Sequence, residues 1–176
     1  MAGLGCRLPR AVGGGAVVTG VRVVSLKVDG PQTIPADGGY HIVCFPYTSE
    51  SHDPWGMHEP VQPDGNTVTS WKTDDRSGLI WPSVAGWGTL TSLIYWEPGD
   101  YDELRDRYVR DPLGVYDSTA TEHRPPSPGI QCFHKSHEMF VRPDVPIALL
   151  VAQDAGTARK LTLAEFKLAI HPVEEA

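Results

Sequence analysis

The chain has 176 residues, of which 40% are hydrophobic and 21% are charged, and it contains 18 glycines and 16 prolines. The apolar content is enough to bury a core, which excludes a wholly disordered chain, and collagen is excluded because there is no Gly-X-Y repeat. A formal charge of −7 without any run of basic residues argues against nucleic acid and anionic membranes as partners. Many turn-forming residues among aromatic ones predict one all-β domain.

Residues 1–20 are the first predicted segment, and they differ from the rest because of the Gly13-Gly14-Gly15 run. Glycines have no side chains through which to order themselves, so these residues are predicted to form a flexible N-terminal arm. The alternative is an arm that becomes ordered by docking on a neighbouring subunit. The residues predicted to make that docking contact are the larger apolar ones, Leu4, Leu8, Val12, Val17 and Val18.

Alternating apolar residues between clusters of turn formers predict a series of short strands after Gly20. The predicted strands cover residues 21–28, 40–45, 68–72, 77–81, 87–96, 130–133, 139–141, 147–153 and 166–171. The phase of the first strand changes at Val24, which predicts a β-bulge. The strand at 87–96 carries large apolar groups on both faces, as expected for a central strand. Eight to ten short strands without βαβ alternation or a long repeat predict a sandwich or jelly roll.

Three further segments complete the chain. Residues 48–66 and 117–129 are rich in Ser, Pro and other turn formers, and both are predicted to be exposed loops. Residues 101–110 fit two patterns, since their apolar positions share a helical face and also fit the two-residue period of a strand. The pattern alone favours a helix there. Residues 173–176 are predicted to be a C-terminal tail.

The sequence shows no uninterrupted apolar run near the length of about 18 residues that a membrane-spanning helix needs, so no membrane insertion is predicted. Residues 1–20 lack the apolar segment of a secretory signal. The three cysteines, Cys6, Cys44 and Cys132, are odd in number and far apart. This spacing favours buried free thiols in a protein made in a reducing cytosol, and a Cys44–Cys132 disulfide is the alternative.

The chemistry-bearing residues do not form a recognisable catalytic or metal-binding motif. His134 and His137 are three apart in a predicted strand, so their side chains point to opposite faces and cannot hold one ion. His52 and His58 lie in a predicted loop without the spacing of a zinc or iron site. Cys132 is not followed by an acid that could orient its neighbour His134. The sequence therefore predicts no catalytic residues, no metal and no cofactor.

Several motifs occur in a fixed order along residues 21–172. They are Gln32-Thr33-Ile34-Pro35 before a strand, Gly56-Met57-His58 in a loop, Pro82-Ser83-Val84-Ala85-Gly86-Trp87 before the central strand, Phe140-Val141-Arg142-Pro143, and Leu149-Leu150-Val151-Ala152-Gln153-Asp154-Ala155-Gly156 before the closing strand. This ordered set resembles the C1q/TNF-like jelly-roll domains of tailed-phage virion proteins. Two departures stand out: Gly88 replaces an aromatic residue of the family, and Pro143-Asp144-Val145-Pro146 replaces its Gly before Asp-Tyr.

The resemblance implies a jelly-roll β-sandwich over residues 21–172, with residues 104–110 on a strand rather than a helix. It also implies a homotrimer built around an aromatic and aliphatic axis. The predicted trimer-interface residues are Tyr95, Leu149, Val151, Phe166, Leu168 and Ile170. The alternative is that these apolar side chains fill the core of a single chain, because unpartnered apolar strand faces would be exposed patches.

The resemblance further implies a non-enzymatic structural protein of a bacteriophage virion, made in the host cytoplasm. It would be displayed on the capsid or tail as a decoration or minor tail protein, next to the major capsid protein or tail proteins, where it could contact a host-surface glycan. The predicted exposed-loop binding residues are His52, Trp55 and His58. A free-standing carbohydrate- or protein-binding module is the alternative, with Trp55, Trp71 or Trp96 as stacking platforms. A jelly-roll enzyme is the third hypothesis.

Overall fold

A computed structural model describes residues 20–47, 52–115 and 117–173 of the chain. The docking residues predicted in the N-terminal arm and most of the predicted C-terminal tail lie outside these described residues. Within them the chain forms strands β1 (Arg22–Val28), β2 (Gln32–Ile34), β3 (His41–Ile42), β4 (Gly86–Trp96), β5 (Glu103–Arg110), β6 (Asp117–Arg124), β7 (Gln131–Val141), β8 (Ile147–Asp154) and β9 (Arg159–Pro172), with one 3-10 helix, Asp75–Gly78.

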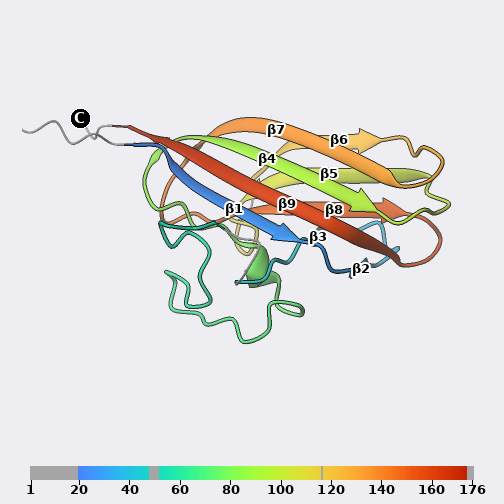
Figure 1. The fold of residues 1–176 in the computed structure, drawn as a ribbon, viewed down its shortest axis with the longest axis horizontal. Helices are drawn as coiled ribbons and strands as arrows, with labels where there is room; N and C mark the ends of the chain where they lie inside the picture. Colours follow the sequence, from blue (N-terminus) through green and yellow to red (C-terminus); the bar gives the residue numbers. More distant parts are fainter. Residues whose placement is uncertain (1–19, 48–51, 116, 174–176) are drawn as a thin grey trace, which may run out of the picture.

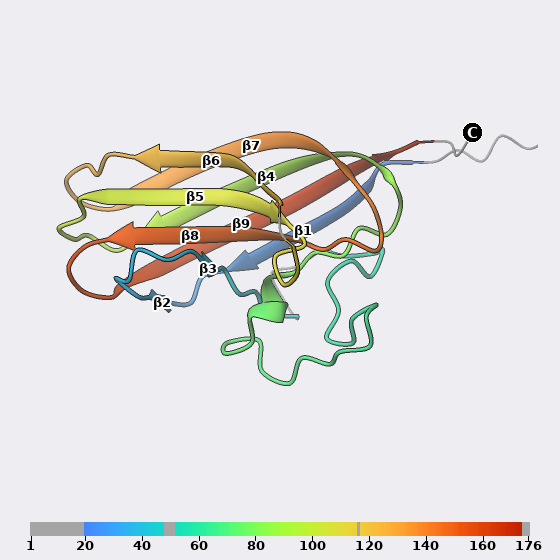
Figure 2. The same cartoon turned by 180° about the vertical axis from the view of Figure 1, so that it is seen from behind.

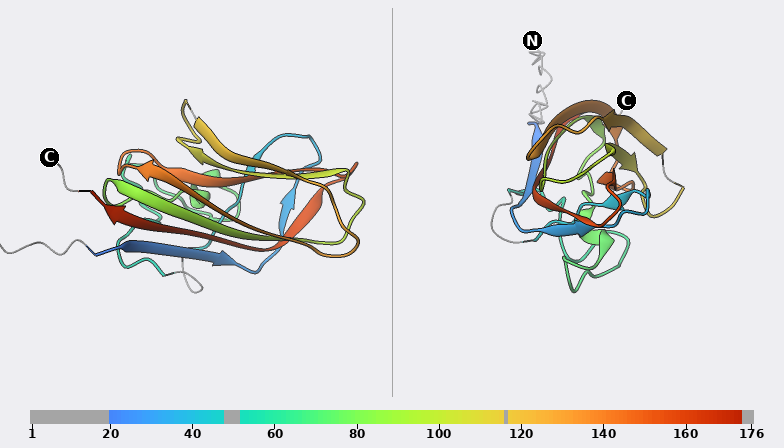
Figure 3. Two further views of the ribbon diagram at one scale, coloured as in Figure 1. Left: turned by 90° about the horizontal axis from the view of Figure 1, so that it is seen from above. Right: turned by 90° about the vertical axis from the view of Figure 1, so that its right-hand side faces the viewer.

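The strands form two antiparallel sheets that pack face to face (Figures 1 and 2). One sheet has the order β1-β9-β4-β7, with β2 also paired to β9, and the other has the order β3-β8-β5-β6. Consecutive strands such as β4 and β5 lie in different sheets, as in a jelly roll, and Figure 3 shows the two layers from the side. The predicted all-β jelly-roll sandwich is confirmed.

Side chains from both sheets meet in one core because alternate residues of each strand point to the same face. In β4 the buried series includes Leu90, Ile94 and Trp96, and β9 contributes Phe166 and its neighbours two residues apart. The ring of Phe166 stacks on that of Tyr108 in β5, with their centroids 5.7 Å apart. This contact joins the centres of the two sheets.

A polar cluster also links the sheets inside the sandwich. The Lys135 ammonium of β7 lies 2.5 Å from a carboxylate oxygen of Asp106 in β5, and both side chains are almost completely buried. The Arg124 guanidinium donates to the other carboxylate oxygen of Asp106 at 2.9 Å. The Tyr108 hydroxyl is 2.9 Å from that of Ser92 in β4. Burial lowers the pKa of Lys135, while its hydrogen bond to Asp106 opposes that shift.

Gly88 in β4 explains one departure from the family motif. A Cβ added there would lie 2.9 Å from the Leu168 Cδ1 atom and 2.9 Å from the Val141 Cγ1 atom. The inner face of β4 therefore has no room for an aromatic side chain at this position. Trp87, one residue earlier, points to the outer face and is 48% exposed.

Residues 103–110 form strand β5, so the strand that the resemblance implied is confirmed over the helix that the local pattern alone favours. Three other predictions about local structure are wrong. Residues 117–124 form strand β6 instead of a loop. The strands expected at 68–72 and 77–81 are replaced by turns and the 3-10 helix, with a single bridge at Ile80. The register between β1 and β9 is continuous, without the bulge expected at Val24.

Candidate functional site

The outer face of the β1-β9-β4-β7 sheet is the first candidate site, and we call it the open face. It consists of the outward residues of the central strands, Thr89, Thr91, Leu93 and Tyr95 in β4 and Leu163, Glu165, Lys167 and Ala169 in β9. All of these side chains are only partly buried. Tyr95 is paired with Leu163 on one side and with Cys132 of β7 on the other, so three side chains form one row across the sheet.

The Tyr95 phenol and the Cys132 thiol interact within this row. A hydrogen bond with Cys132 raises the pKa of Tyr95, so the phenol stays protonated at neutral pH. Trp87 and Phe140 are register partners farther along the same face, 48% and 39% exposed. The open face thus carries aromatic and aliphatic groups toward its two ends, whereas the row of Thr91 between them is polar, with Lys167 and Ser136 as its register partners.

The outer face of the other sheet is different, and we call its apolar part the covered face. Val109 of β5 and Ala148 and Leu150 of β8 form a second hydrophobic cluster with Leu79 and Trp81. The last two residues belong to the long connection between β3 and β4, which we call the covering loop, residues 43–85. Val109 and Ala148 are fully buried as a result.

The covering loop is held by its own polar contacts. The Nε2 atom of His58 lies 2.8 Å from the Ser77 carbonyl oxygen, and its ring stacks on Tyr47 with centroids 4.5 Å apart. The backbone N–H of His58 donates to a carboxylate oxygen of Asp53 at 2.6 Å. Burial lowers the pKa of His58, although the Ser77 contact opposes that shift, and burial raises the pKa of Tyr47 to about 12.

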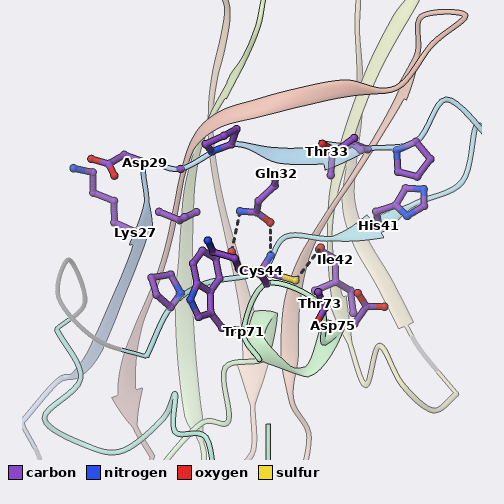
Figure 4. A pocket seen from close by; sticks show the side chains of 17 residues that line it. Lys27, Asp29, Gln32, Thr33, His41, Ile42, Cys44, Trp71, Thr73 and Asp75 are labelled. Carbon is purple, nitrogen blue, oxygen red and sulfur yellow. Dashed lines mark hydrogen bonds between the residues drawn. The ribbon is translucent and has the colours of Figure 1, made fainter. Parts of the chain in front are cut away.

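A pocket opens at one edge of the sandwich, between β1 and β2 of one sheet and β3 of the other (Figure 4). Its volume is about 790 Å³, and its walls include Gln32, His41, Cys44 and Trp71. The Gln32 carboxamide bridges the two sheets, since its Nε2 donates to the Cys44 carbonyl and its Oε1 accepts from the Cys44 N–H, both at 2.9 Å. Burial raises the pKa of the Cys44 thiol, so it is protonated at neutral pH.

The residues predicted to form a trimer interface divide into two groups. Five of them lie between the sheets and are fully buried within one chain: Leu149, Val151, Phe166, Leu168 and Ile170. They fill the core, which is the alternative that the sequence left open, so the interface prediction is wrong for them. Tyr95 alone of that set points outward, because its position in β4 has the opposite parity. Its role in an interface stays a prediction.

The exposed-loop predictions also divide. His52 is exposed and pairs with Ser25 of β1, and Trp55 is 46% exposed with the Arg22 guanidinium 4.7 Å from the centre of its ring. His58 is only 4% exposed, so the prediction of a surface binding residue is wrong: it anchors the covering loop instead. Of the three proposed stacking platforms, Trp96 is buried in the core and Trp71 lines the pocket.

The sequence reasoning missed the pocket itself. Gln32 was noticed only as part of a motif, and nothing in its sequence context indicates that it binds the backbone of Cys44. The two described cysteines are free, so the alternative of a Cys44–Cys132 disulfide is wrong. Cys44 is buried as predicted, whereas Cys132 is exposed, so the prediction of a buried thiol is wrong for Cys132. The described ranges contain no group of three or more His, Cys, Asp or Glu side chains that could hold a metal ion. In those ranges, too, no helix has the length and apolar character to cross a bilayer.

Comparison with known proteins gives the fold. Neither a protein-family model nor a curated protein matches the chain. The globular domain of zebrafish complement 1qA is similar with a TM-score of 0.57 and 12% identity, covering 88% of this chain and 99% of that one. Murine APRIL gives 0.55 and 10%, covering 86% and 100%. Eiger TNF from S. frugiperda gives 0.52 and 12%, covering 88% and 94%. The chain has the C1q/TNF-like jelly-roll fold.

Proposed function

We propose that the chain is a non-enzymatic structural domain that self-associates as a homotrimer through its open face. The observation that carries this proposal is the row formed by Leu163, Tyr95 and Cys132, with Leu93 beside it. Across the described residues, no segment of the chain packs over this row as the covering loop packs on the other sheet. Apolar strand faces of this kind are typical of interfaces between subunits.

In a closed trimer, the open face of every subunit is buried against another subunit. Around a three-fold axis each chain offers two surfaces, and three identical contacts close the ring. The resemblance to trimeric jelly rolls implies this number of copies, and the C1q/TNF-like fold agrees with it. Aromatic residues such as Tyr95 are enriched at the centres of interfaces, where they bury much area with little loss of conformational entropy.

Sedimentation equilibrium of the purified chain tests the self-association. We expect a species of three times the mass of the chain, and we expect Tyr95→Arg to convert it to monomers because a charge would be buried without a partner. Val61→Arg is the matched control, since Val61 is 65% exposed and belongs to the covering loop, outside the strands of the sheet that carries the open face. A monomeric wild-type chain, or a trimer unchanged by Tyr95→Arg, contradicts the proposal.

We further propose that this structural domain belongs to a bacteriophage virion, on the capsid or the tail. The ordered motifs from Gln32-Thr33-Ile34-Pro35 to the Gln153 region support this assignment. Two of them contact each other, since the Gln153 Nε2 donates to the Pro35 carbonyl at 3.0 Å. Residues 1–20 would dock the domain on capsid or tail proteins.

Particle composition tests the virion assignment separately from the trimer. Peptides of this chain should be found by mass spectrometry in purified particles, and a chain without residues 1–20 should still form trimers but not enter particles. A matched variant with Leu4, Leu8 and Val12 changed to Ser should behave in the same way. Incorporation of the truncated chain overturns the docking arm, and the absence of the intact chain from particles overturns the virion assignment.

A further inference from the structure

The pocket at the sandwich edge has the size and openness of a ligand site. Its volume of about 790 Å³ lies within the range of about 300–1,000 Å³ found for small-molecule sites. The described residues that line it come from three segments of the chain, 27–35, 41–46 and 71–75. Figure 4 shows Gln32 reaching from β2 toward Cys44, with the indole of Trp71 beside it.

Strand addition by a peptide is blocked in this pocket. An extended peptide would need free backbone groups on a strand edge. The N–H and carbonyl of Cys44 are both occupied by the Gln32 carboxamide. The N–H groups of Val43 and Phe45 donate to Leu149 and Ser77, and on β1 the backbone of Ser25 is paired with His52. The backbone of residues 43–45 is therefore not free to pair with a peptide, and a ligand on that side of the pocket has side chains to bind.

The available side chains combine an aromatic surface with polar groups of both charges. Trp71 is partly buried against the core, and the Lys72 ammonium lies 5.5 Å from the centre of its ring. Within the described residues, Thr33 and Asp75 make no side-chain hydrogen bond, so both remain able to bind a ligand. Lys27 and Lys72 balance Asp29 and Asp75, and the lining carries little net charge, a lysine for each carboxylate.

We propose that this pocket binds a neutral oligosaccharide. The C–H face of a sugar ring is apolar and matches the indole of Trp71, while its hydroxyl groups both donate and accept hydrogen bonds. Asp75 would accept from a sugar hydroxyl, Thr33 would donate or accept, and Lys72 would donate. The balanced charge of the lining disfavours a sugar that carries carboxylates. This inference goes beyond self-association and does not depend on it, because a single chain supplies the described residues that line the pocket.

Titration calorimetry with defined sugars tests the proposal. The probes are maltohexaose, cellohexaose and hexa-N-acetylchitohexaose as neutral oligosaccharides, with sialyllactose as the acidic comparison. We expect at least one neutral probe to bind the full chain more tightly than sialyllactose. Trp71→Ala should weaken that binding at least about tenfold, and Trp71→Phe should retain most of it because a ring remains. Trp55→Ala is the matched control and should bind like the wild type.

Two more variants keep the test decisive if Trp71→Ala does not fold. Asp75→Ala removes the exposed carboxylate and should weaken the same probe. Gly30→Trp should block the pocket, since a Cβ at Gly30 meets no atom within 4 Å and the larger side chain can be accommodated there. The proposal is overturned if no neutral probe binds at about 10 mM. It is also overturned if only sialyllactose binds, or if the Trp71, Asp75 and Gly30 variants all bind like the wild type.

Discussion

The covered face of the β3-β8-β5-β6 sheet buries Val109 and Ala148 completely under Leu79 and Trp81, whereas the open face of the other sheet leaves Leu93 and Tyr95 partly exposed. Both faces carry apolar side chains on the side that points away from the sandwich interior. On one side the chain covers its apolar residues with its own covering loop, and on the other the proposed trimer contact would cover them.

The difference between the two faces lies in connectivity. The covering loop joins β3 to β4 and runs beside β8, where Ile80 exchanges backbone hydrogen bonds with Ile147. The open face has β4 and β9 at its centre. β4 begins where the covering loop ends, but that loop packs on the other sheet, and the connections after β4 and before β9, residues 97–102 and 155–158, are short. The path of one long loop therefore decides which sheet face is covered and which stays partly exposed.

The largest expected effect comes from breaking the polar cluster that holds the two faces in one sandwich. Asp106→Ala leaves the Lys135 and Arg124 cations without their buried partner and should lower the free energy of unfolding by about 3–5 kcal/mol. Urea unfolding measures this loss. Both faces should then lose protection from hydrogen exchange together.

Two matched variants check the interpretation of Asp106→Ala. Glu122→Ala removes only an exposed contact to Arg124 and should cost less than about 1 kcal/mol. A double variant, Asp106→Leu with Lys135→Met, should recover much of the stability, because a packed apolar pair replaces a buried ion pair. If Glu122→Ala lowers the free energy of unfolding as much as Asp106→Ala, burial of the ion pair does not explain the stability that Asp106 contributes.

A second, smaller effect contrasts a tryptophan from each face. Trp81→Ala uncovers Val109 and Ala148 and should cost about 3 kcal/mol, at the low end for a buried aromatic residue because Trp81 is at the edge of its cluster. Trp87→Ala on the open face should change the free energy of unfolding by less than about 1 kcal/mol. Equal losses measured by urea unfolding at low protein concentration would show that the two faces do not differ.

The smallest expected effect is a pH dependence of the free energy of unfolding that is caused by His58 in the covering loop. Burial keeps the pKa of His58 below its ordinary value of 6.5, so the unfolded chain takes up a proton at this residue as the pH falls through 6.5 while the folded chain does not. The free energy of unfolding should therefore fall from pH 7.5 toward pH 5.5, down to the lowered folded pKa.

His58→Gln should flatten this slope, since no proton is then taken up on unfolding at position 58. His52→Gln is the matched control: His52 is exposed in the same loop, and its replacement should leave the slope unchanged. Urea titrations at several pH values give the slope of each variant. A slope that survives His58→Gln assigns the pH dependence to another group.

Much of the architecture could be predicted from local patterns, and the failures have identifiable causes. The sequence predicts β4 from its long run with apolar groups on both faces, and it predicts only the second half of β9, where Phe166, Leu168 and Ile170 alternate with other residues. β6 was missed because it is an edge strand with polar residues on both sides, and such strands lack alternation. The apolar residues near 77–81 have the alternation of a strand because Leu79 and Trp81 pack on the outer face of a sheet. An irregular segment that covers a sheet therefore shows the same residue pattern as a strand.

The candidate sites were less accessible to sequence reasoning. Tyr95 was placed with the interface residues, yet Phe166 and Leu168 were grouped with it although they point the other way. The polar neighbours of His58 in the chain predict a surface residue, whereas its burial depends on contacts with Ser77 and Tyr47, which are distant from it in the sequence. Trp71 was one of three equal alternatives until the pocket distinguished it.

The sequence by itself determined the strand period, the all-β class and the order of motifs, because these depend on neighbours along the chain. Only the tertiary structure decided which face of each strand points into the core, since alternation defines two faces without saying which one meets the other sheet. It also decided where the pocket lies, because Gln32, Cys44 and Trp71 come together only when the edges of two sheets meet. Both features depend on packing between segments that are distant in the sequence.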